Sequence, residues 1–446
     1  MLTVDFANVT EARIGPDQGL DLERELRAHT PPLEQALEAL WARHRDPDMP
    51  LGWIAVPEDT ETARAALRYR EANPWVTDVV VLGIGGSALG AQAVHAALGD
   101  RRVALHFVDN VEPEPVLHLL GSLNPRTTLV NVISKSGTTA ETMAAFLVFR
   151  KWLEDALGAE WRRHVAVTTD PKKGVLRPYA ARHGLTAFSI PPTVGGRFSV
   201  LTPVGLVPLA FAGVDLEGLL AGARKANETA AAPVAENLPA QTALVQYLYY
   251  RRGKPISVLM PYSTRMRLVP DWFVQLHAES LGKAESKTGS RVHVGPTPLK
   301  AVGTTDQHAQ VQLYREGPFD KLVVFVRLER PTTDLELPAV EGLEALDYLF
   351  GKRLFELLTA EAKATAHALA KARRPNYTIQ LEQLDAYHLG WLLQHLMWQT
   401  AILGELLGVN AFDQPGVELG KQYTYALMGR AGFEALAEEL KAEGVV

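Results

Sequence analysis

Short runs of apolar, mostly β-branched residues alternate with longer helical stretches through much of the chain. In the first half these runs fall at residues 79–82, 103–108, 128–133, 165–168 and 185–190. Each has the length of a strand and few polar residues, as is typical of strands buried on both faces. Short apolar strands that alternate with helices predict a parallel sheet covered on both sides.

A second set of such elements follows a long Ala-rich helical stretch at residues 216–250. Strands are predicted at residues 256–260, 322–328 and 377–381, and a helix at residues 271–281. Helices otherwise dominate the last hundred residues. The pattern therefore predicts an α/β protein with two α/β units of unequal size.

These units divide the chain into four segments. Residues 1–60 are predicted to be helical, and residues 61–215 to form the first α/β domain. Residues 216–400 are predicted to form the second domain, and residues 401–446 a helical C-terminal segment.

Composition narrows the possible functions. The 446 residues carry 45 basic and 51 acidic side chains, and this negative balance does not favour general nucleic-acid binding. There is no cysteine, so disulfides, thiolate metal sites and cysteine nucleophiles are excluded. The start has no signal-peptide pattern, and the longest apolar stretch, residues 200–214, contains two prolines. We expect a cytoplasmic protein that binds neither nucleic acid nor membranes.

A glycine-rich loop, Gly83-Ile-Gly-Gly-Ser-Ala-Leu-Gly90, joins the first predicted strand to a helix. Glycines at such a junction let backbone N–H groups approach an anion. The spacing differs from a dinucleotide-binding fingerprint because Ala88 stands where the third glycine is needed. This mismatch argues against a nucleotide-dependent oxidoreductase. A tight turn that serves helix packing alone remains an alternative.

A second loop, Ser134-Lys-Ser-Gly-Thr-Thr139, also lies between a strand and a helix. Its four hydroxyls and one ammonium group would suit a phosphate, since hydroxyl and backbone donors at a helix N-terminus bind anions. The alternative is a cluster of N-capping hydroxyls, which uses the same donors. Phosphate binding is the favoured interpretation.

Two further segments supply an arginine and a carboxylate. In Gly195-Gly-Arg-Phe-Ser199, the glycines would let Arg197 point inward and stabilise an oxyanion, although a surface salt bridge is equally consistent. In Gln275-Leu-His-Ala-Glu-Ser-Leu-Gly-Lys283, Gln275 and Glu279 are four apart, so they share one face of the helix predicted at residues 271–281. A lone helical glutamate is usually solvated, so Glu279 gains significance only from its partners.

A histidine and a lysine complete the candidate set. His308 lies in the polar segment Gly303-Thr-Thr-Asp-Gln-His308, and Lys421 ends Phe412-Asp-Gln-Pro-Gly-Val-Glu-Leu-Gly-Lys421. Each residue alone is more simply explained by a structural or solvated role. No grouping of histidines and carboxylates has metal-ligand spacing.

Together these six segments, in this order, resemble glucose-6-phosphate isomerases over roughly residues 70–430. The segment that ends at Lys421 is the most specific. The resemblance implies two α/β/α sandwich domains of the sugar-isomerase (SIS) type and a C-terminal helical segment that completes the active site. It also implies a homodimer in which the neighbouring subunit supplies His308.

The resemblance further implies a role for each candidate residue. Glu279 would transfer the proton between C2 and C1, Arg197 would stabilise the cis-enediolate, and His308 with Lys421 would open the sugar ring. The phosphate would be held by Ser87, Ser134, Lys135, Ser136 and Thr139, and the remaining substrate contacts would be Gly86, Gly196, Gln275 and Gln414.

An aldose–ketose conversion of this kind needs neither a redox cofactor nor a metal, because a fixed arginine can polarise the carbonyl. We therefore expect an isomerase of glucose 6-phosphate and fructose 6-phosphate without a cofactor. The alternative is a non-catalytic sugar-phosphate-binding protein with the same domains. Such a protein would not need Glu279, Arg197, His308 and Lys421 together.

Overall fold

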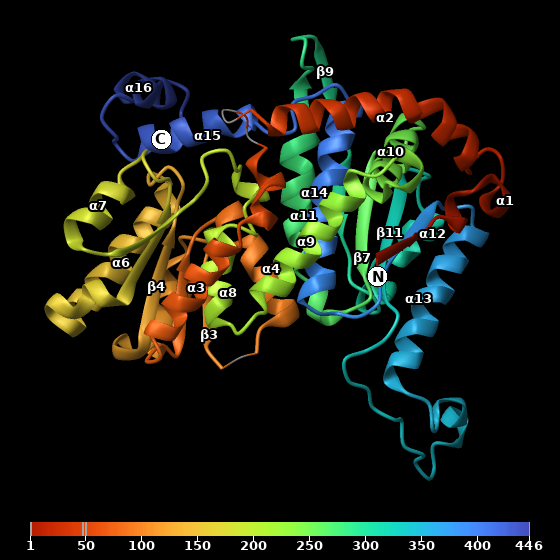
Figure 1. Ribbon diagram of the computed structural model, residues 1–446, viewed down its shortest axis with the longest axis horizontal. Coiled ribbons are helices and arrows are strands. Elements are labelled where there is room, and N and C mark those ends of the chain that lie inside the picture. The colour runs from red at the N-terminus through yellow and green to blue at the C-terminus, as the bar shows by residue number, and fades with distance from the viewer. Residues whose placement is uncertain (1, 47–48, 50, 101, 446) are drawn as a thin grey trace.

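The computed structural model describes residues 2–46, 49, 51–100 and 102–445. Two five-stranded sheets stand at opposite ends of the molecule, with helices between them (Figure 1). The prediction of an α/β protein with two mainly parallel sheets is confirmed. In the part of the chain that is described, no helix combines the length and apolar character needed to cross a membrane.

The first sheet is entirely parallel, in the order β3-β2-β4-β5-β6. Along β2, Val80 and Leu82 pack into one hydrophobic cluster while Val79 and Val81 pack into another, so both faces are buried as the pattern predicted. Its strands are β2 Asp78–Leu82, β3 Ala104–Val108, β4 Thr128–Ile133, β5 Val165–Thr169 and β6 Thr186–Ser189. Its helices are α3 Thr60–Ala72, α4 Leu89–Leu98, α5 Pro113–Ser122, α6 Ala140–Leu157, α7 Leu176–His183 and α8 Pro203–Phe211.

The second sheet has the order β1-β12-β11-β7-β10, in which β1 is antiparallel to its neighbour and the other pairs are parallel. Its strands are β1 Leu2–Asp5, β7 Ile256–Pro261, β10 Thr297–Lys300, β11 Lys321–Leu328 and β12 Asn376–Leu381. The helices around it are α1 Glu11–Ile14, α2 Leu22–His44, α10 Leu238–Arg251, α11 Val269–Leu281, α12 Val311–Glu316 and α13 Leu354–Lys371.

The centre of the molecule is built around helix α14, Ala386–Leu406, which is buried along most of its length. It packs against α9 (Leu216–Ala230), α10, α11 and α2. The crossing with α9 is close because Gly390 has no side chain: a Cβ there would lie 2.0 Å from the carbonyl oxygen of Leu219. One continuous hydrophobic cluster therefore reaches from α14 to the second sheet.

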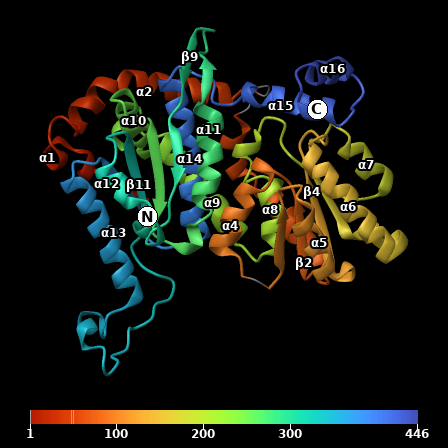
Figure 2. The same ribbon diagram turned by 180° about the vertical axis from the view of Figure 1, so that it is seen from behind.

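Several elements differ from the predictions. The described part of the segment predicted to be helical, residues 2–46, 49 and 51–60, is mainly helical, but it begins with strand β1, which pairs with β12 in the second sheet. The predicted boundary between residues 400 and 401 falls inside α14. A hairpin of β8 (Lys283–Glu285) and β9 (Arg291–Val294) was not predicted, nor was β10. The C-terminal segment contains α15, Glu418–Leu427, and α16, Glu434–Ala442, near the first domain (Figure 2).

Two buried histidines should make the folded protein less stable in acid. Burial lowers the pKa of His277 and of His395 from 6.5 to about 3. In the unfolded chain both would bind protons as the pH falls through 6.5, whereas the folded protein resists protonation until much lower pH. Stability should therefore be greatest above pH 6.5 and fall below it, by up to about 1.4 kcal/mol per pH unit for each histidine.

Thermal unfolding at pH 7.0 and pH 5.5 measures this effect. The melting temperature should fall over this interval, and the fall should be smaller in His277→Met. The matched control is His118→Gln, because His118 is exposed on α5 and its replacement should leave the fall unchanged. An equal fall in the wild type and His277→Met would contradict the assignment to His277.

Candidate active site

A cleft of about 520 Å³ lies between the loops at the carboxyl ends of β2 and β4 and the helices α11 and α15. Ligands of open parallel sheets commonly bind at this edge. Nine of the thirteen predicted site residues line the cleft. The lining residues are Ile84, Gly85, Gly86, Ser136, Thr138, Thr139, Ala140, Glu141, Gly196, Arg197, Gln275, Glu279, Gln414, Val417, Glu418, Lys421, Thr424 and Tyr425.

The hydroxyl-rich loop joins β4 to the N-terminus of α6, as predicted. Ser136, Thr138 and Thr139 face the cleft. Ser134 is buried beneath them: its hydroxyl lies 3.1 Å from that of Thr139 and accepts a hydrogen bond from the Gly137 N–H at 3.1 Å. Ser134 thus organises the loop, while the other hydroxyls and the helix N-terminus present donors to an anion.

Lys135 contacts a different part of the protein. Its ammonium group donates hydrogen bonds to the carbonyl oxygens of Pro192 and Val194, at 2.6 and 2.9 Å. Burial lowers the pKa of Lys135, and the charge of Asp170 opposes that change. Lys135 therefore ties the hydroxyl loop to the segment that carries Arg197. Neither Lys135 nor Ser87 lines the cleft. Their contacts with phosphate stay predictions.

The two glycine loops touch each other directly. A Cβ on Gly86 would lie 2.2 Å from the carbonyl carbon of Gly196, so any side chain at residue 86 would separate the two backbones. The preceding Gly85 has φ +57°, and a Cβ there would lie 2.7 Å from the side-chain nitrogen of Gln275. Glycine at both positions lets this backbone approach both Gly196 and α11.

Arg197 is held at the base of the cleft with a side chain only 3% exposed. Its guanidinium donates to the Ser280 hydroxyl at 2.8 Å and to the Gln414 side-chain oxygen at 2.9 Å. It also donates to the carbonyl oxygens of Ala411 and Asp413, at 2.7 and 3.0 Å. Burial lowers the pKa of Arg197 while the charges of Glu279 and Asp413 raise it, and the guanidinium keeps its charge at neutral pH.

Glu279 lies in the last turn of α11, where its carboxylate meets Arg197. One oxygen is 3.2 Å from the Arg197 Nη1 atom, and the other accepts from Gln275 Nε2 at 3.1 Å. The side chain is 32% exposed, so the carboxylate is fixed at one end of the cleft and still open to it. The spacing of Gln275 and Glu279 on one helix face is confirmed.

Lys421 and His308 differ in their relation to the cleft. Lys421 on α15 lines it, although its ammonium group is exposed and pairs with Glu418 at 2.8 Å. His308, in the short helix Thr305–His308, is exposed and does not line the cleft within this chain.

Some site residues were not predicted from the sequence. Ser280 and the carbonyl groups of residues 411 and 413 orient Arg197, and Glu418 pairs with Lys421. Both Ser280 and Glu418 belong to the motifs quoted above. Ser280 follows Glu279 directly and Glu418 precedes Lys421 by one helical turn, so their positions in the sequence could have indicated them. Backbone carbonyls leave no such signal in a sequence.

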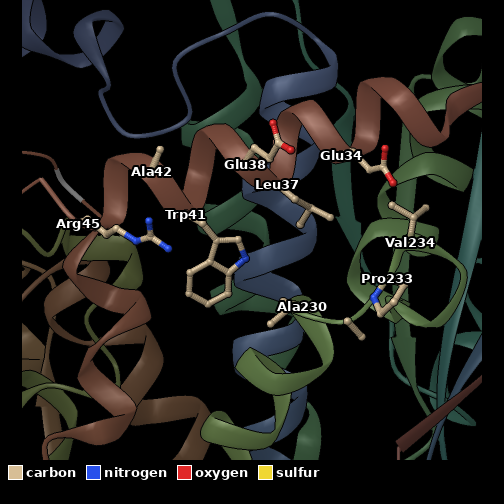
Figure 3. Close-up of a pocket in the computed structure, with 11 residues that line it drawn as sticks. Glu34, Leu37, Glu38, Trp41, Ala42, Arg45, Ala230, Pro233 and Val234 are labelled. Carbon is tan, nitrogen blue, oxygen red and sulfur yellow. The ribbon is translucent and has the colours of Figure 1, made fainter.

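A larger hollow, of about 720 Å³, lies between α2 and the segment that follows α9 (Figure 3). Trp41 and Leu37 contribute apolar surface there, and Glu34, Glu38 and Arg45 contribute charges. It contains none of the predicted site residues and no cluster of groups suited to acid–base chemistry. The smaller cleft is therefore the candidate active site. Among the described residues, no group of three or more histidine and carboxylate side chains is placed to hold a metal ion.

A loop with hydroxyl donors shares one cleft with a carboxylate and a buried guanidinium. This arrangement defines the class: an α/β protein whose cleft suits acid–base chemistry on an anionic substrate. Comparison with known proteins identifies the family. The phosphoglucose isomerase model matches residues 60–432. The chain belongs to this family and is an aldose–ketose isomerase.

Individual relatives agree with this assignment. The chain is 60% identical over 399 residues to the glucose-6-phosphate isomerase of Thermus thermophilus, covering 90% of this chain and 95% of the relative. It is 42% identical to that of Carboxydothermus hydrogenoformans, covering 98% and 97%. A crystal structure of a glucose-6-phosphate isomerase from Chlamydia trachomatis matches with a TM-score of 0.82 at 25% identity, covering 100% of this chain and 92% of that one.

Proposed function

We propose that this chain interconverts glucose 6-phosphate and fructose 6-phosphate through a cis-enediolate. The observation that carries the proposal is the meeting of the Glu279 carboxylate with the buried Arg197 guanidinium, in a cleft that also holds the hydroxyl loop. Aldose–ketose conversion needs one base that can move a proton between adjacent carbons, and a positive charge for the oxyanion that forms.

The phosphate group is placed at the loop of Ser136, Thr138 and Thr139. Backbone N–H groups and hydroxyls at the N-terminus of α6 offer donors there, and the helix dipole favours the negative charge. Gly86, Gly196, Gln275 and Gln414 line the cleft beside the sugar. This anchoring would hold C1 and C2 next to Glu279.

In the proton-transfer step, Glu279 takes the proton from C2 of the open-chain aldose and returns it to C1. Electron density moves from the broken C–H bond into the carbonyl at C1, which gives the enediolate with its negative charge on O1. When the proton is returned to C1, the proton of the O2 hydroxyl passes to O1, so that the carbonyl ends at C2. Arg197 stabilises the oxyanion because its charge is fixed in place before the reaction begins. The sugar is oxidised at one carbon and reduced at the next, so no external electron acceptor is required.

Ring opening is assigned to His308 and Lys421, with His308 supplied by a second copy of this chain. The exposed position of His308 outside its own cleft supports this assignment. A second observation supports a homodimer: the segment at residues 329–353 projects from the body (Figures 1 and 2). It exposes five large apolar residues: Leu335, Val340, Leu343, Leu346 and Tyr348.

A coupled assay tests the reaction. Fructose 6-phosphate is supplied, and glucose 6-phosphate is detected as it forms, with and without EDTA. We expect turnover that EDTA does not change. Absence of glucose 6-phosphate would refute the proposed reaction, whereas loss of turnover with EDTA would refute the metal-independent mechanism alone. The same coupled method tests mannose 6-phosphate as a second substrate. The cytoplasmic location of the protein stays a prediction.

A further inference from the structure

Lys283, directly after α11, is a buried cation whose hydrogen bonds are all made inside the protein. Its side chain is only 5% exposed. The ammonium group donates to the backbone carbonyl of Glu279 at 2.8 Å, to the backbone carbonyl of Asp413 at 2.5 Å, and to the Asp413 carboxylate at 2.9 Å. Three acceptors match the three protons of an ammonium group, so Lys283 retains no donor for a substrate.

The first of these bonds ends the helix that carries the base. The last four carbonyls of an α-helix have no partner within it. In α11 the Gly282 N–H satisfies Ala278, and the Lys283 side chain satisfies Glu279. A cation in this position also interacts favourably with the negative end of the helix dipole. The backbone of Glu279 is thus fixed by a side chain four residues later.

The other two bonds reach the segment before α15, and together they close a ring. The Asp413 carbonyl accepts from both Lys283 and Arg197. Arg197 in turn contacts the Glu279 carboxylate, and Lys283 contacts the Glu279 backbone. The ring therefore restrains the distance between the Glu279 carboxylate and the Arg197 guanidinium. Its four members are Arg197, Glu279, Lys283 and Asp413.

We propose that Lys283 is a positioning residue that holds Glu279 at the geometry needed for proton transfer. This inference rests on the proposed function of Glu279 as the base. Lys283 would act through Glu279 and Asp413, without touching the substrate. Its effect on the rate can still be large, because a displacement of about 1 Å at a reacting group costs about 10²-fold in rate. Burial lowers the pKa of Lys283, and its bonds to Asp413 oppose this, so Asp413 supports the charged form that makes all three bonds.

Lys283→Met tests the inference, since methionine retains an apolar chain of similar length and removes the donors. We expect kcat for fructose 6-phosphate to fall about 10- to 100-fold, with KM changed less than about threefold. Lys283→Arg should recover part of kcat, because a guanidinium can donate to the same carbonyls.

The matched control is Lys254→Met. Lys254 is also a buried lysine, but it precedes β7 and does not line the cleft. The substitution Lys254→Met should lower the melting temperature and leave kcat per folded molecule near the wild-type value. Equal losses of kcat in the two variants, or a folded Lys283→Met with kcat within about twofold of wild type, would overturn the proposal.

A crystal structure of Lys283→Met separates this inference from the proposed function. We expect Asp413 and the Glu279 carboxylate to move relative to Arg197. If the Arg197–Glu279 and Arg197–Asp413 contacts keep their distances of 3.2 and 3.0 Å, Lys283 does not position the base, whatever the activity. Failure of the proposed function would instead appear as an inactive wild-type enzyme.

Discussion

Replacing Glu279 with glutamine should lower kcat about 10³- to 10⁴-fold and change KM for fructose 6-phosphate by less than about threefold. Glutamine fills the same space and can still contact Gln275 and Arg197, but it cannot accept a proton from carbon. Loss of the base therefore raises the barrier of the chemical step and leaves substrate binding almost unchanged. Steady-state kinetics in the coupled assay measure both constants.

The matched control is Glu285→Gln, which removes an exposed carboxylate six residues further along, outside the cleft. It should retain wild-type kinetics. Near-normal turnover in Glu279→Gln would show that another group is the base.

Mixing Glu279→Gln with His308→Ala extends this experiment to the proposed dimer. Each variant alone should be nearly inactive. If His308 acts in the neighbouring subunit, a mixed dimer has one site with both Glu279 and His308, and one with neither. Random reassortment should then restore about a quarter of wild-type activity. No recovery after dissociation and reassembly would contradict sharing of His308.

Replacing Arg197 with methionine should lower kcat about 10²- to 10³-fold, the loss typical of removing a donor to a developing oxyanion. It should also lower the melting temperature. The Ala411 and Asp413 carbonyls and the Gln414 side chain would lose their shared donor, and Glu279 would lose its ion pair. Breaking a buried ion pair by removing one partner typically costs about 3–5 kcal/mol, reduced here because Glu279 is partly exposed.

Kinetics and thermal unfolding of Arg197→Met and Arg197→Lys together separate the two effects. Lysine restores the charge but not the planar set of donors, so Arg197→Lys should recover less than full kcat. Rates are compared per folded molecule, below the unfolding transition. If Arg197→Met stays within about tenfold of wild type in kcat, Arg197 is structural and does not stabilise the enediolate.

Much of the fold could be predicted because buried strands leave a strong signal. All eight predicted strands form, most within two residues of the predicted ends. In the part of the chain that the structure describes, four strands were missed, and all four are short. β10 has only four residues, includes Pro298 and lies at a sheet edge, where proline is tolerated and the apolar pattern is weak. β1 likewise lies at an edge and pairs with a strand more than 370 residues later.

The candidate site was predictable where residue type reveals chemistry. The segment of Gly196 and Arg197 was identified, as was the hydroxyl loop, whose Ser136, Thr138 and Thr139 line the cleft together with Gly196 and Arg197. The contacts of Lys135 were not predictable, since its partners are backbone carbonyls more than fifty residues away. The contacts of Lys283 with Asp413 were hidden in the same way, because Asp413 lies 130 residues away in the chain.

Local patterns in the sequence were sufficient to predict the two α/β units, the positions of the loops and the family to which they point. Local periodicity and motif order carry this information, because strands, helices and tight turns depend on neighbouring residues. Which side chains meet in the cleft depends on the three-dimensional arrangement of these elements. Arg197 and Glu279 are 82 residues apart in the chain and 3.2 Å apart in space, and Lys283 reaches Asp413 across 130 residues. Contacts over such separations depend on how the helices pack around α14, which no local pattern specifies.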